Sequence, residues 1–467
     1  MLTYFPRFFS FRAIICYIVT LALVSFFFLS YAMLFQFMVF GLVSVIVFFT
    51  YSNKLTMKWY KLPTKTYTKK LFIASLIIRI IYVVFIYFYF IEMTGIPHAY
   101  HAGDEMAYQL WGSIWREKGF DEMKTMMSQI YFSDRGYPWL LGFEYLLFGT
   151  HVLPARIIKC IISAFSCVLM YNLAKRNFGE AAGRITGVFC MLMPSMWYYC
   201  GITLKEAEMA FLTILFVERA DLAFRSRKIS LVNFILPGIV ILVMFTFRTA
   251  LAGVLVAALI AALIMSSGRQ LQTWKKILYS LLFGVWMFMT VGVEMVEETQ
   301  MLWEGRETNQ VEGYQERAMR SGGNAFARYA TASVFAPMIF TIPFSTMVKV
   351  PNQEIQMMLN GANFVKNILS GLTILTLFLL LKRGDWRKHV LSIAVLGGYL
   401  VVLVFSNFAH SERFHFPVLA LELMFAAYGV TQLTNKHKRW YVMWLVGMCI
   451  ANIAWNWIKL AGRGLSV

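Results

Sequence analysis

The chain has 467 residues, of which 59% are hydrophobic and only 14% are charged. Ordinary soluble domains are roughly 45–50% apolar and about 25% charged, so the composition excludes a water-soluble globular protein. The formal charge of +19 would suggest a nucleic-acid partner in a soluble protein, but here the basic residues lie in short turns between apolar stretches. The sequence therefore predicts an all-α polytopic membrane protein with no nucleic-acid partner.

A helix that crosses a membrane needs about 20 mostly apolar residues. Thirteen stretches of this kind can be placed: 13–30, 31–50, 71–93, 152–174, 185–202, 206–224, 231–247, 249–267, 277–293, 361–381, 390–407, 414–433 and 440–458. The first residues lead into apolar segments too long for a signal peptide, so we expect no cleavage.

These stretches divide the chain into four parts. We expect an N-terminal hairpin with a basic loop (1–70), a central module (71–293), an outer segment (294–360) and C-terminal helices (361–467).

Charge is distributed very unevenly over the turns. The turns on one side of the predicted spans hold 24 Lys or Arg and only two acids, whereas the long segments 95–151 and 294–360 on the other side hold seven and eight acids. The positive-inside rule places the basic turns and the N-terminus in the cytoplasm. The chain has no Asn-X-Ser/Thr sequence, which favours a bacterial inner membrane with the acidic segments in the periplasm.

The first outer segment, 95–151, combines apolar and polar residues at helical spacing. Met106, Leu110 and Ile114 predict an amphipathic helix over 105–118 that lies in the membrane interface. A second such helix is expected over 121–131.

Two other outer stretches are apolar but interrupted by proline. The stretch 136–149 is too short to span and contains Pro138, and 334–348 contains two prolines. We interpret both as interfacial or re-entrant segments.

Asp104 and Glu105 form an acid pair at the start of the first predicted interfacial helix. Asp is a preferred helix cap and Glu suits the first turn, so a purely structural role is one interpretation. The functional interpretation is a general base at the membrane surface, where partial desolvation raises a carboxylate pKa toward neutrality. The two roles can coexist.

Lys205 and Glu206 occupy a tight outer turn directly before an apolar helix. Ionisable residues at such a boundary are functional candidates. The alternative is that Lys205 extends to the interface and Glu206 caps the following helix.

Three arginines, Arg135, Arg248 and Arg413, lie on the outer side, where positive charge is otherwise scarce. Guanidinium groups bind phosphate in a planar, bidentate geometry. The alternative for each is a lipid headgroup contact or a pair with a neighbouring acid. Arginines beside an acid at a membrane surface could hold a lipid-linked phosphate donor while the acid deprotonates an incoming hydroxyl.

Four stretches carry a family resemblance: GDEMAYQLWGSIWREKGF, RGYPWLLGFEYLLFG, the long run from ARIIKC to LTILF, and SERFHFPVLALELMFAAYGV. They resemble the GT-C superfamily of membrane glycosyltransferases, in particular the protein O-mannosyltransferases and the lipid A aminoarabinose transferase. The resemblance implies a GT-C fold and a donor sugar on a polyprenyl phosphate.

The resemblance also implies roles for particular residues. Asp104 would be the catalytic base, Glu105 would support it or contact the acceptor, and Arg135 would hold the donor phosphate. The turn of Lys205 and Glu206 would lie near the site. Some members of the superfamily use a divalent ion, which Asp104 and Glu206 could bind, but no histidine and acid spacing in this chain demands a metal.

We therefore predict an inverting glycosyltransferase that moves a sugar from a polyprenyl phosphate to a hydroxyl of a glycan, lipid or protein, without a required cofactor. One rival is a polymerase or ligase that uses a lipid pyrophosphate donor. Another is a flippase or transporter, which predicts ionisable residues at mid-membrane and paired broken helices.

Overall fold

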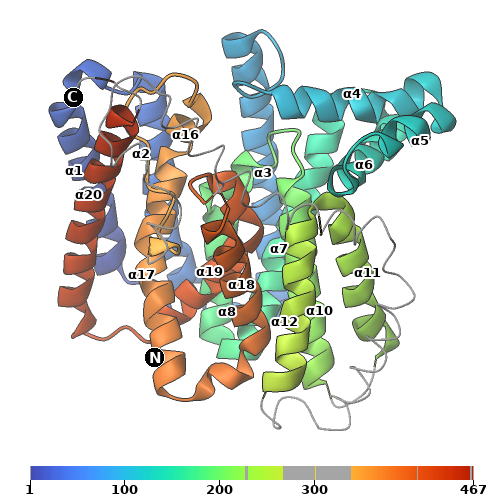
Figure 1. Cartoon of the computed structure of the whole chain (residues 1–467). Coiled ribbons are helices and arrows are strands. Elements are labelled where there is room, and N and C mark those ends of the chain that lie inside the picture. The colour runs from blue at the N-terminus through green and yellow to red at the C-terminus, as the bar shows by residue number, and fades with distance from the viewer. Residues whose placement is uncertain are drawn as a thin grey trace.

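In the computed structural model, the described residues are 2–226, 230–266, 300, 338–406, 409–462 and 465. They fold almost entirely into helices, and the extended pairing among them is one isolated bridge between Ala32 and Val348. The long helices stand side by side in one bundle (Figure 1), with α1 and α20 together at one edge.

Within the described ranges, seven helices are long and apolar enough to cross a membrane. They are α1 (Arg7–Phe27), α2 (Phe35–Trp59), α3 (Thr64–Thr94), α7 (Val152–Phe178), α17 (Asn360–Lys382), α19 (Glu412–Thr431) and α20 (His437–Ala461). Shorter apolar helices are α11 (Leu231–Phe247), α12 (Thr249–Met265) and α18 (Val390–Val404). The predicted all-α polytopic class is confirmed. The total of thirteen membrane spans stays a prediction, and the span expected at 277–293 lies outside the described residues.

The span predicted over 185–202 is wrong as one helix. The structure has α8 (Glu180–Leu192) and α9 (Pro194–Tyr198) there, followed by a turn that leads into α10 (Glu206–Arg225). Met193 is extended because the residue before a proline is sterically kept out of the helical region. The break places the turn with Lys205 and Glu206 beside the other outer elements.

Three helices form an outer layer across the ends of the bundle (Figure 1): α4 (Gly103–Lys118), α5 (Phe120–Ser128) and α6 (Phe132–Phe148). The predicted amphipathic helix over 105–118 is confirmed as α4. The second predicted helix ends at Ser128 instead of residue 131, and the stretch from 136 belongs to one continuous helix that contains Pro138. A Cβ at Gly142 would lie 2.9 Å from the Trp115 ring, so the glycine lets α4 and α6 pack closely.

The centre of the bundle is α19, whose apolar stretch is 89% buried, compared with 28% for α3 at the periphery. Short elements complete the described chain: η1 (Leu29–Tyr31), α16 (Glu354–Met358) and η3 (Asp385–Lys388). The first turn of α19 lies next to the outer elements and therefore brings its charged residues to the middle of one bundle end.

The segment expected to be re-entrant over 334–348 is described from residue 338. Its residues 341–348 are non-helical and buried. Backbone inside a membrane protein must find its hydrogen bonds within the protein. Here asparagine side chains supply them: Asn456 accepts from the Met347 N–H at 2.7 Å and donates to the Ser345 carbonyl at 3.0 Å, and Asn452 accepts from the Ser345 N–H at 2.8 Å.

Replacing Asn456 with Leu is expected to lower the unfolding free energy by about 2–4 kcal/mol, because it leaves two buried backbone groups without partners. The measurement is thermal unfolding of the purified protein in detergent. Asn435→Leu, at an exposed position, is the control. An equal loss in both variants would contradict this role of Asn456.

Candidate active site

A cleft of about 290 Å³ opens where the outer layer meets the end of the bundle. It lies between the start of α4, the turn before α10, α16 and the first turn of α19. Its lining residues include Tyr100, His101, Asp104, Glu105, Tyr199, Leu204, Gln353, Gln356, Glu412 and Arg413. Four segments that are far apart in the sequence therefore build one polar cavity.

Arg413 joins two acids at the wall of this cleft. Its Nη1 lies 2.5 Å from Oδ2 of Asp104, and its Nε contacts Oε1 of Glu206. The side chain of Asp104 is 63% exposed, that of Arg413 is 22% exposed and that of Glu206 is fully buried. The buried Glu206 therefore holds Arg413 in place, and the exposed Asp104 is accessible to a ligand in the cleft.

The capping interpretations of Asp104 and Glu206 are wrong. The cap residues of α4 and α10 are Ala102 and Lys205, and neither helix has a side-chain cap hydrogen bond. Both carboxylates bind Arg413 instead. The sequence could not show this pairing, because Arg413 follows Asp104 by more than 300 positions.

Lys205 is buried and forms its ion pair with Asp134, not with Glu206. Its Nζ lies 2.5 Å from Oδ1 of Asp134 and donates to the Ser133 carbonyl at 3.0 Å, while the Tyr108 hydroxyl donates to the same Asp134 oxygen at 3.1 Å. Burial, with a contribution from the charge of Arg248, holds the pKa of Lys205 below its ordinary value, although Asp134 opposes this shift. Lys205 therefore ties the start of α6 to the turn before α10 and places one more cation near the cleft.

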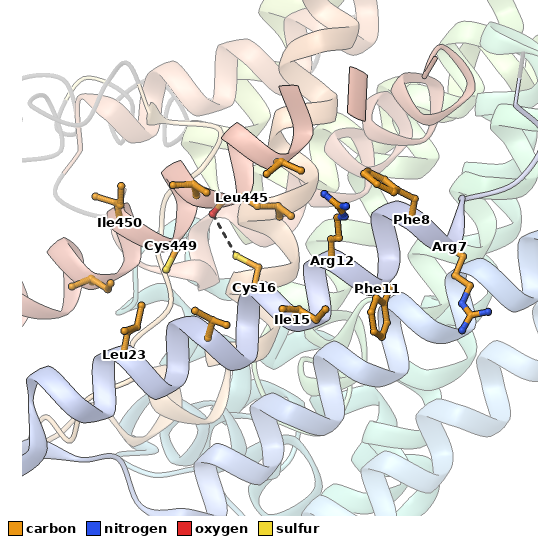
Figure 2. Close-up of a pocket in the computed structure, with 14 residues that line it drawn as sticks. Arg7, Phe8, Phe11, Arg12, Ile15, Cys16, Leu23, Leu445, Cys449 and Ile450 are labelled. Carbon is orange, nitrogen blue, oxygen red and sulfur yellow. Dashed lines mark hydrogen bonds between the residues drawn. The ribbon is translucent and has the colours of Figure 1, made fainter. Parts of the chain in front are cut away.

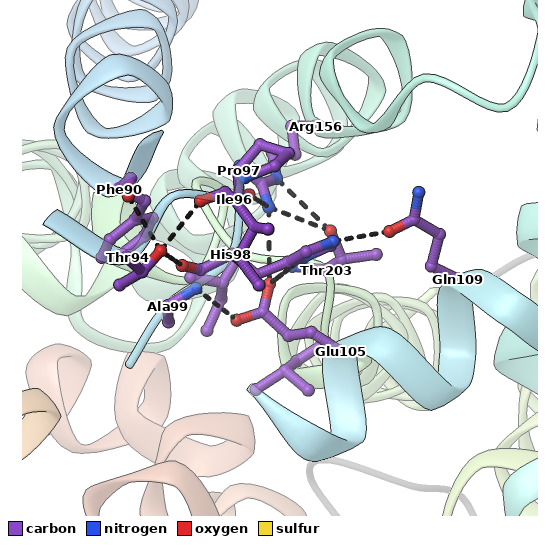
Figure 3. Close-up of polar contacts among 12 residues, drawn as sticks. Phe90, Thr94, Ile96, Pro97, His98, Ala99, Glu105, Gln109, Arg156 and Thr203 are labelled. Atoms are coloured by element: carbon purple, nitrogen blue, oxygen red, sulfur yellow. Dashed lines mark hydrogen bonds and ion pairs between the residues drawn. The ribbon is translucent and has the colours of Figure 1, made fainter. Parts of the chain in front are cut away.

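Glu105 lies next to Asp104 but its carboxylate serves a separate network (Figure 3). It accepts hydrogen bonds from the backbone N–H groups of Thr203 at 2.7 Å and Ala99 at 3.1 Å. His98 and Arg156 contact the same carboxylate, each at 3.4 Å. This network holds the loop before α4 against the turn before α10. Whether Glu105 also contacts a substrate stays a prediction.

The pKa of Glu105 reflects opposing effects. Burial alone would raise it, but the hydrogen bond to His98, the charge of Arg156 and the Thr203 N–H together hold the pKa below its ordinary value. Glu105 is therefore ionised at neutral pH. Its contacts stabilise the fold above pH 4.5, the ordinary pKa, and that contribution is lost as the pH falls through the lower, folded-state value.

Glu105→Gln is expected to cost about 3 kcal/mol of stability at neutral pH, because it leaves the buried Arg156 charge uncompensated. The variant is also expected to lose less stability than the wild type on acidification below pH 4.5. Glu144→Gln is the control: burial, followed by the neighbouring Glu208, raises the pKa of Glu144 to about 8, so the amide resembles the protonated acid at neutral pH. Thermal unfolding against pH tests both. An equal loss of stability at neutral pH in Glu105→Gln and Glu144→Gln would contradict the role of Glu105 as the ionised partner of Arg156.

The remaining predicted arginines are not part of the cleft lining. Arg248 lies between α11 and α12, with its guanidinium 4.4 Å from the Phe414 ring centre and 3.4 Å from the Tyr399 hydroxyl. It is close to Arg413 in space because Phe414 is the next residue. Arg135, in α6, donates from Nε to the Ile130 carbonyl and stacks on Phe132. The structure thus brings Arg413, Arg248 and Lys205 toward one region and leaves Arg135 at its side.

Sequence reasoning missed the cations of α7. Arg156 holds Glu105, and the Nζ of Lys159 lies 3.4 Å from Glu208 and donates to the carbonyls of Ile202 and Leu204. Both are buried. Lys159 supports the backbone of the turn before α10, and Arg156 joins the Thr203 hydroxyl of that turn to the Pro97 carbonyl of the loop before α4. The sequence contains the signal that would have identified them. Two basic residues three positions apart inside a predicted apolar span are energetically costly, so they indicate a structural or functional role.

A metal site was left open at Asp104 and Glu206. In the ranges that the structure describes, no group of three or more His, Cys, Asp or Glu side chains could hold a metal ion. Asp104 and Glu206 are instead bridged by Arg413. Metal dependence stays an open prediction.

Comparisons with known proteins add family evidence. Residues 136–293 match the family described as dolichyl-phosphate-mannose-protein mannosyltransferase, and residues 358–461 match the Alg9-like mannosyltransferase family. The predicted resemblance to the GT-C superfamily of membrane glycosyltransferases is confirmed by these matches. No curated protein matches the chain.

Two similar solved structures are ArnT from Cupriavidus metallidurans bound to undecaprenyl phosphate and the oligosaccharyltransferase of Archaeoglobus fulgidus tethered with an acceptor peptide. The first is 14% identical with a TM-score of 0.47, over 80% of this chain and 63% of that chain. The second is 12% identical with a TM-score of 0.44, over 87% and 56%. The chain therefore spans about 60% of the length of these two proteins.

Proposed function

We propose that the protein is a membrane glycosyltransferase that transfers a sugar from a polyprenyl-phosphate donor to a hydroxyl group of a glycan, lipid or protein. The observation that carries this proposal is the set of Asp104, Arg413 and Glu206 in the wall of the cleft. A cation that binds phosphate and an exposed carboxylate that accepts a proton are the two groups this reaction needs. The matched family named for a dolichyl-phosphate-mannose donor supports the same donor class.

In the proposed reaction, the donor phosphate replaces Asp104 as the partner of Arg413. This exchange frees the Asp104 carboxylate, which then takes the proton of the acceptor hydroxyl as its oxygen attacks the anomeric carbon. The bond between that carbon and the phosphate oxygen breaks, and the polyprenyl phosphate departs with both bonding electrons. Arg413, with Lys205 and Arg248 nearby, offsets its charge. A single displacement inverts the anomeric configuration.

The proposed location is the bacterial inner membrane, with the N-terminus in the cytoplasm and the cleft facing the periplasm. Three consecutive helices that are long enough to span, α1, α2 and α3, separate the basic N-terminus from α4. Three crossings support a cleft on the membrane face opposite to the first basic turns, which the positive-inside rule assigns to the cytoplasm.

The test is sugar transfer by the purified full chain from a panel of radiolabelled polyprenyl-phosphate sugars to a membrane glycan extract. Transfer from at least one monosaccharide donor, with inverted configuration in the product, is the expected result. Transfer only from lipid-pyrophosphate oligosaccharides would instead identify a polymerase or ligase. Movement of a lipid-linked sugar from one leaflet of a liposome membrane to the other, without sugar transfer to an acceptor, would identify a flippase.

The proposal assigns the positive charge at the phosphate to side chains, so dialysis against EDTA is expected to leave transfer unchanged. Loss of transfer that Mg²⁺ or Mn²⁺ restores would instead support a divalent ion held by Asp104 and Glu206.

A further inference from the structure

A large groove of about 970 Å³ lies between the first and last long helices, α1 and α20 (Figure 2). Both helices stand at the edge of the bundle (Figure 1), so the groove faces the surroundings of the protein. Most of its lining is aliphatic or aromatic, including Phe11, Ile15, Val19, Leu23, Val442, Val446, Ile450 and Ile453.

The two helices run parallel and are in direct contact behind the groove. The Tyr441 hydroxyl donates to the Phe9 carbonyl at 3.1 Å, and Cys16 donates to the Leu445 carbonyl at 3.4 Å. The groove wall is exposed, with Phe11 at 56% and Ile450 at 63%. A large apolar exposure of this kind in a membrane protein is a surface for lipid chains.

One end of the groove is cationic. Figure 2 shows Arg7 and Arg12 at one end of the lining, and Leu23 and Ile450 at the other. The Arg12 guanidinium lies 4.0 Å from the Phe8 ring centre, and the Lys438 ammonium lies 5.3 Å from the same ring. Within the described part of the chain, no carboxylate pairs with these three cations, so their charge is available to a ligand.

We propose that this groove binds an anionic phospholipid of the bilayer, with its phosphate at Arg12 and Lys438, which both lie against the Phe8 ring, with Arg7 adding positive charge at the same end, and with an acyl chain along the apolar lining. Basic residues at one end of an apolar groove between membrane helices match this ligand in both charge and shape. The site is independent of the proposed transferase activity, because the cations lie at the start of α1 and the cleft lies beyond the end of α3, on the opposite membrane face.

A second copy of the chain fits the groove less well. A two-fold interface brings the same patch of both copies together, and in a membrane the two copies stand in the same orientation. The cationic ends would then face each other. An anionic lipid neutralises these charges instead.

The test uses the full chain in neutral detergent, with phosphatidylglycerol as the anionic probe and phosphatidylcholine as the neutral one. Native mass spectrometry measures the lipid retained, and thermal unfolding measures the stabilisation. Phosphatidylglycerol is expected to bind preferentially and to raise the unfolding temperature. Arg7→Gln with Arg12→Gln is expected to weaken its binding by roughly 5-fold for each arginine. Both arginines are exposed, so the fold does not depend on them.

Two further variants complete the test. Lys65→Gln with Lys69→Gln removes two exposed cations from the first turns of α3, on the same membrane face but outside the groove, and is expected to leave binding unchanged. Val446→Trp fills the groove and is expected to reduce binding with the cations intact. The proposal would be overturned if the arginine pair and the lysine pair of substitutions weakened phosphatidylglycerol binding equally. It would also be overturned if the wild type retained phosphatidylglycerol and phosphatidylcholine equally. A dimer that Val446→Trp dissociates would do so too, by assigning the groove to a second copy.

Discussion

Asp104→Asn is expected to reduce the rate of sugar transfer by about 10²–10⁴-fold while donor binding is retained or becomes tighter, because a neutral amide competes less with the donor phosphate for Arg413. The factor is the usual contribution of a general base. The amide keeps the shape of the side chain and accepts a hydrogen bond from Arg413 through its remaining oxygen, but it cannot take a proton from the acceptor. Stability should change by less than about 1 kcal/mol, because the side chain is 63% exposed and lies in the first turn of α4. Single-turnover transfer and binding of the radiolabelled donor separate the two effects.

Asp121→Asn is a matched control for this variant. Asp121 is the second residue of α5, as Asp104 is of α4, and it is exposed in the same outer layer without lining the cleft. Its substitution is expected to leave transfer unchanged. Full activity of Asp104→Asn would remove Asp104 as the base and direct attention to Glu206.

Much of the fold followed from local sequence because membrane spans and interfacial helices have strong periodic signals. The helix predicted over 105–118 is α4 to within two residues at its start, and its end at Gly119 has the positive φ of 95° that glycine allows. The break at Pro194 was missed because the apolar run continues through it, and hydropathy does not register a lost backbone donor.

The candidate site was predicted less completely, because its geometry depends on long-range pairs. The residues Asp104, Glu206 and Arg413 were each identified from charge on the outer side, but nothing local to them indicates that they form one set. Glu105 and Asp104 are adjacent and chemically alike. Only the position of Arg156 and Thr203 beside one carboxylate, and of Arg413 beside the other, separates a fold-holding acid from an exposed one.

The pairing has a consequence for how the site works. Arg413 contacts Glu206 through Nε and Asp104 through Nη1, so a donor phosphate competes with these two carboxylates for the positive charge of the guanidinium. Glu206 is fully buried and Asp104 is exposed, so exchange at Asp104 costs less desolvation. In the proposed reaction, donor binding and release of the Asp104 carboxylate from Arg413 are then one event. This order disfavours side reactions of an unoccupied site.

Arg413→Gln is expected to abolish transfer and to destabilise the protein by about 3–5 kcal/mol, because it leaves the buried Glu206 charge without its partner. The double variant Arg413→Gln with Glu206→Gln removes both charges and is expected to regain most of that stability. It should still bind the donor about 100-fold more weakly than the wild type, since the phosphate has lost its charged partner. Arg387→Gln, an exposed arginine outside the cleft, is the control.

Thermal unfolding and donor binding, measured on the single and double variants, distinguish a structural role of Arg413 from a binding role. If Arg413 only compensated Glu206, the double variant would recover both stability and transfer. Recovery of stability without recovery of donor binding is the expected result, because only the phosphate role needs the guanidinium itself. Donor binding by Arg413→Lys should fall between that of the wild type and that of Arg413→Gln. A single ammonium keeps the charge but cannot contact Asp104 and Glu206 through the two separate nitrogens that the arginine uses.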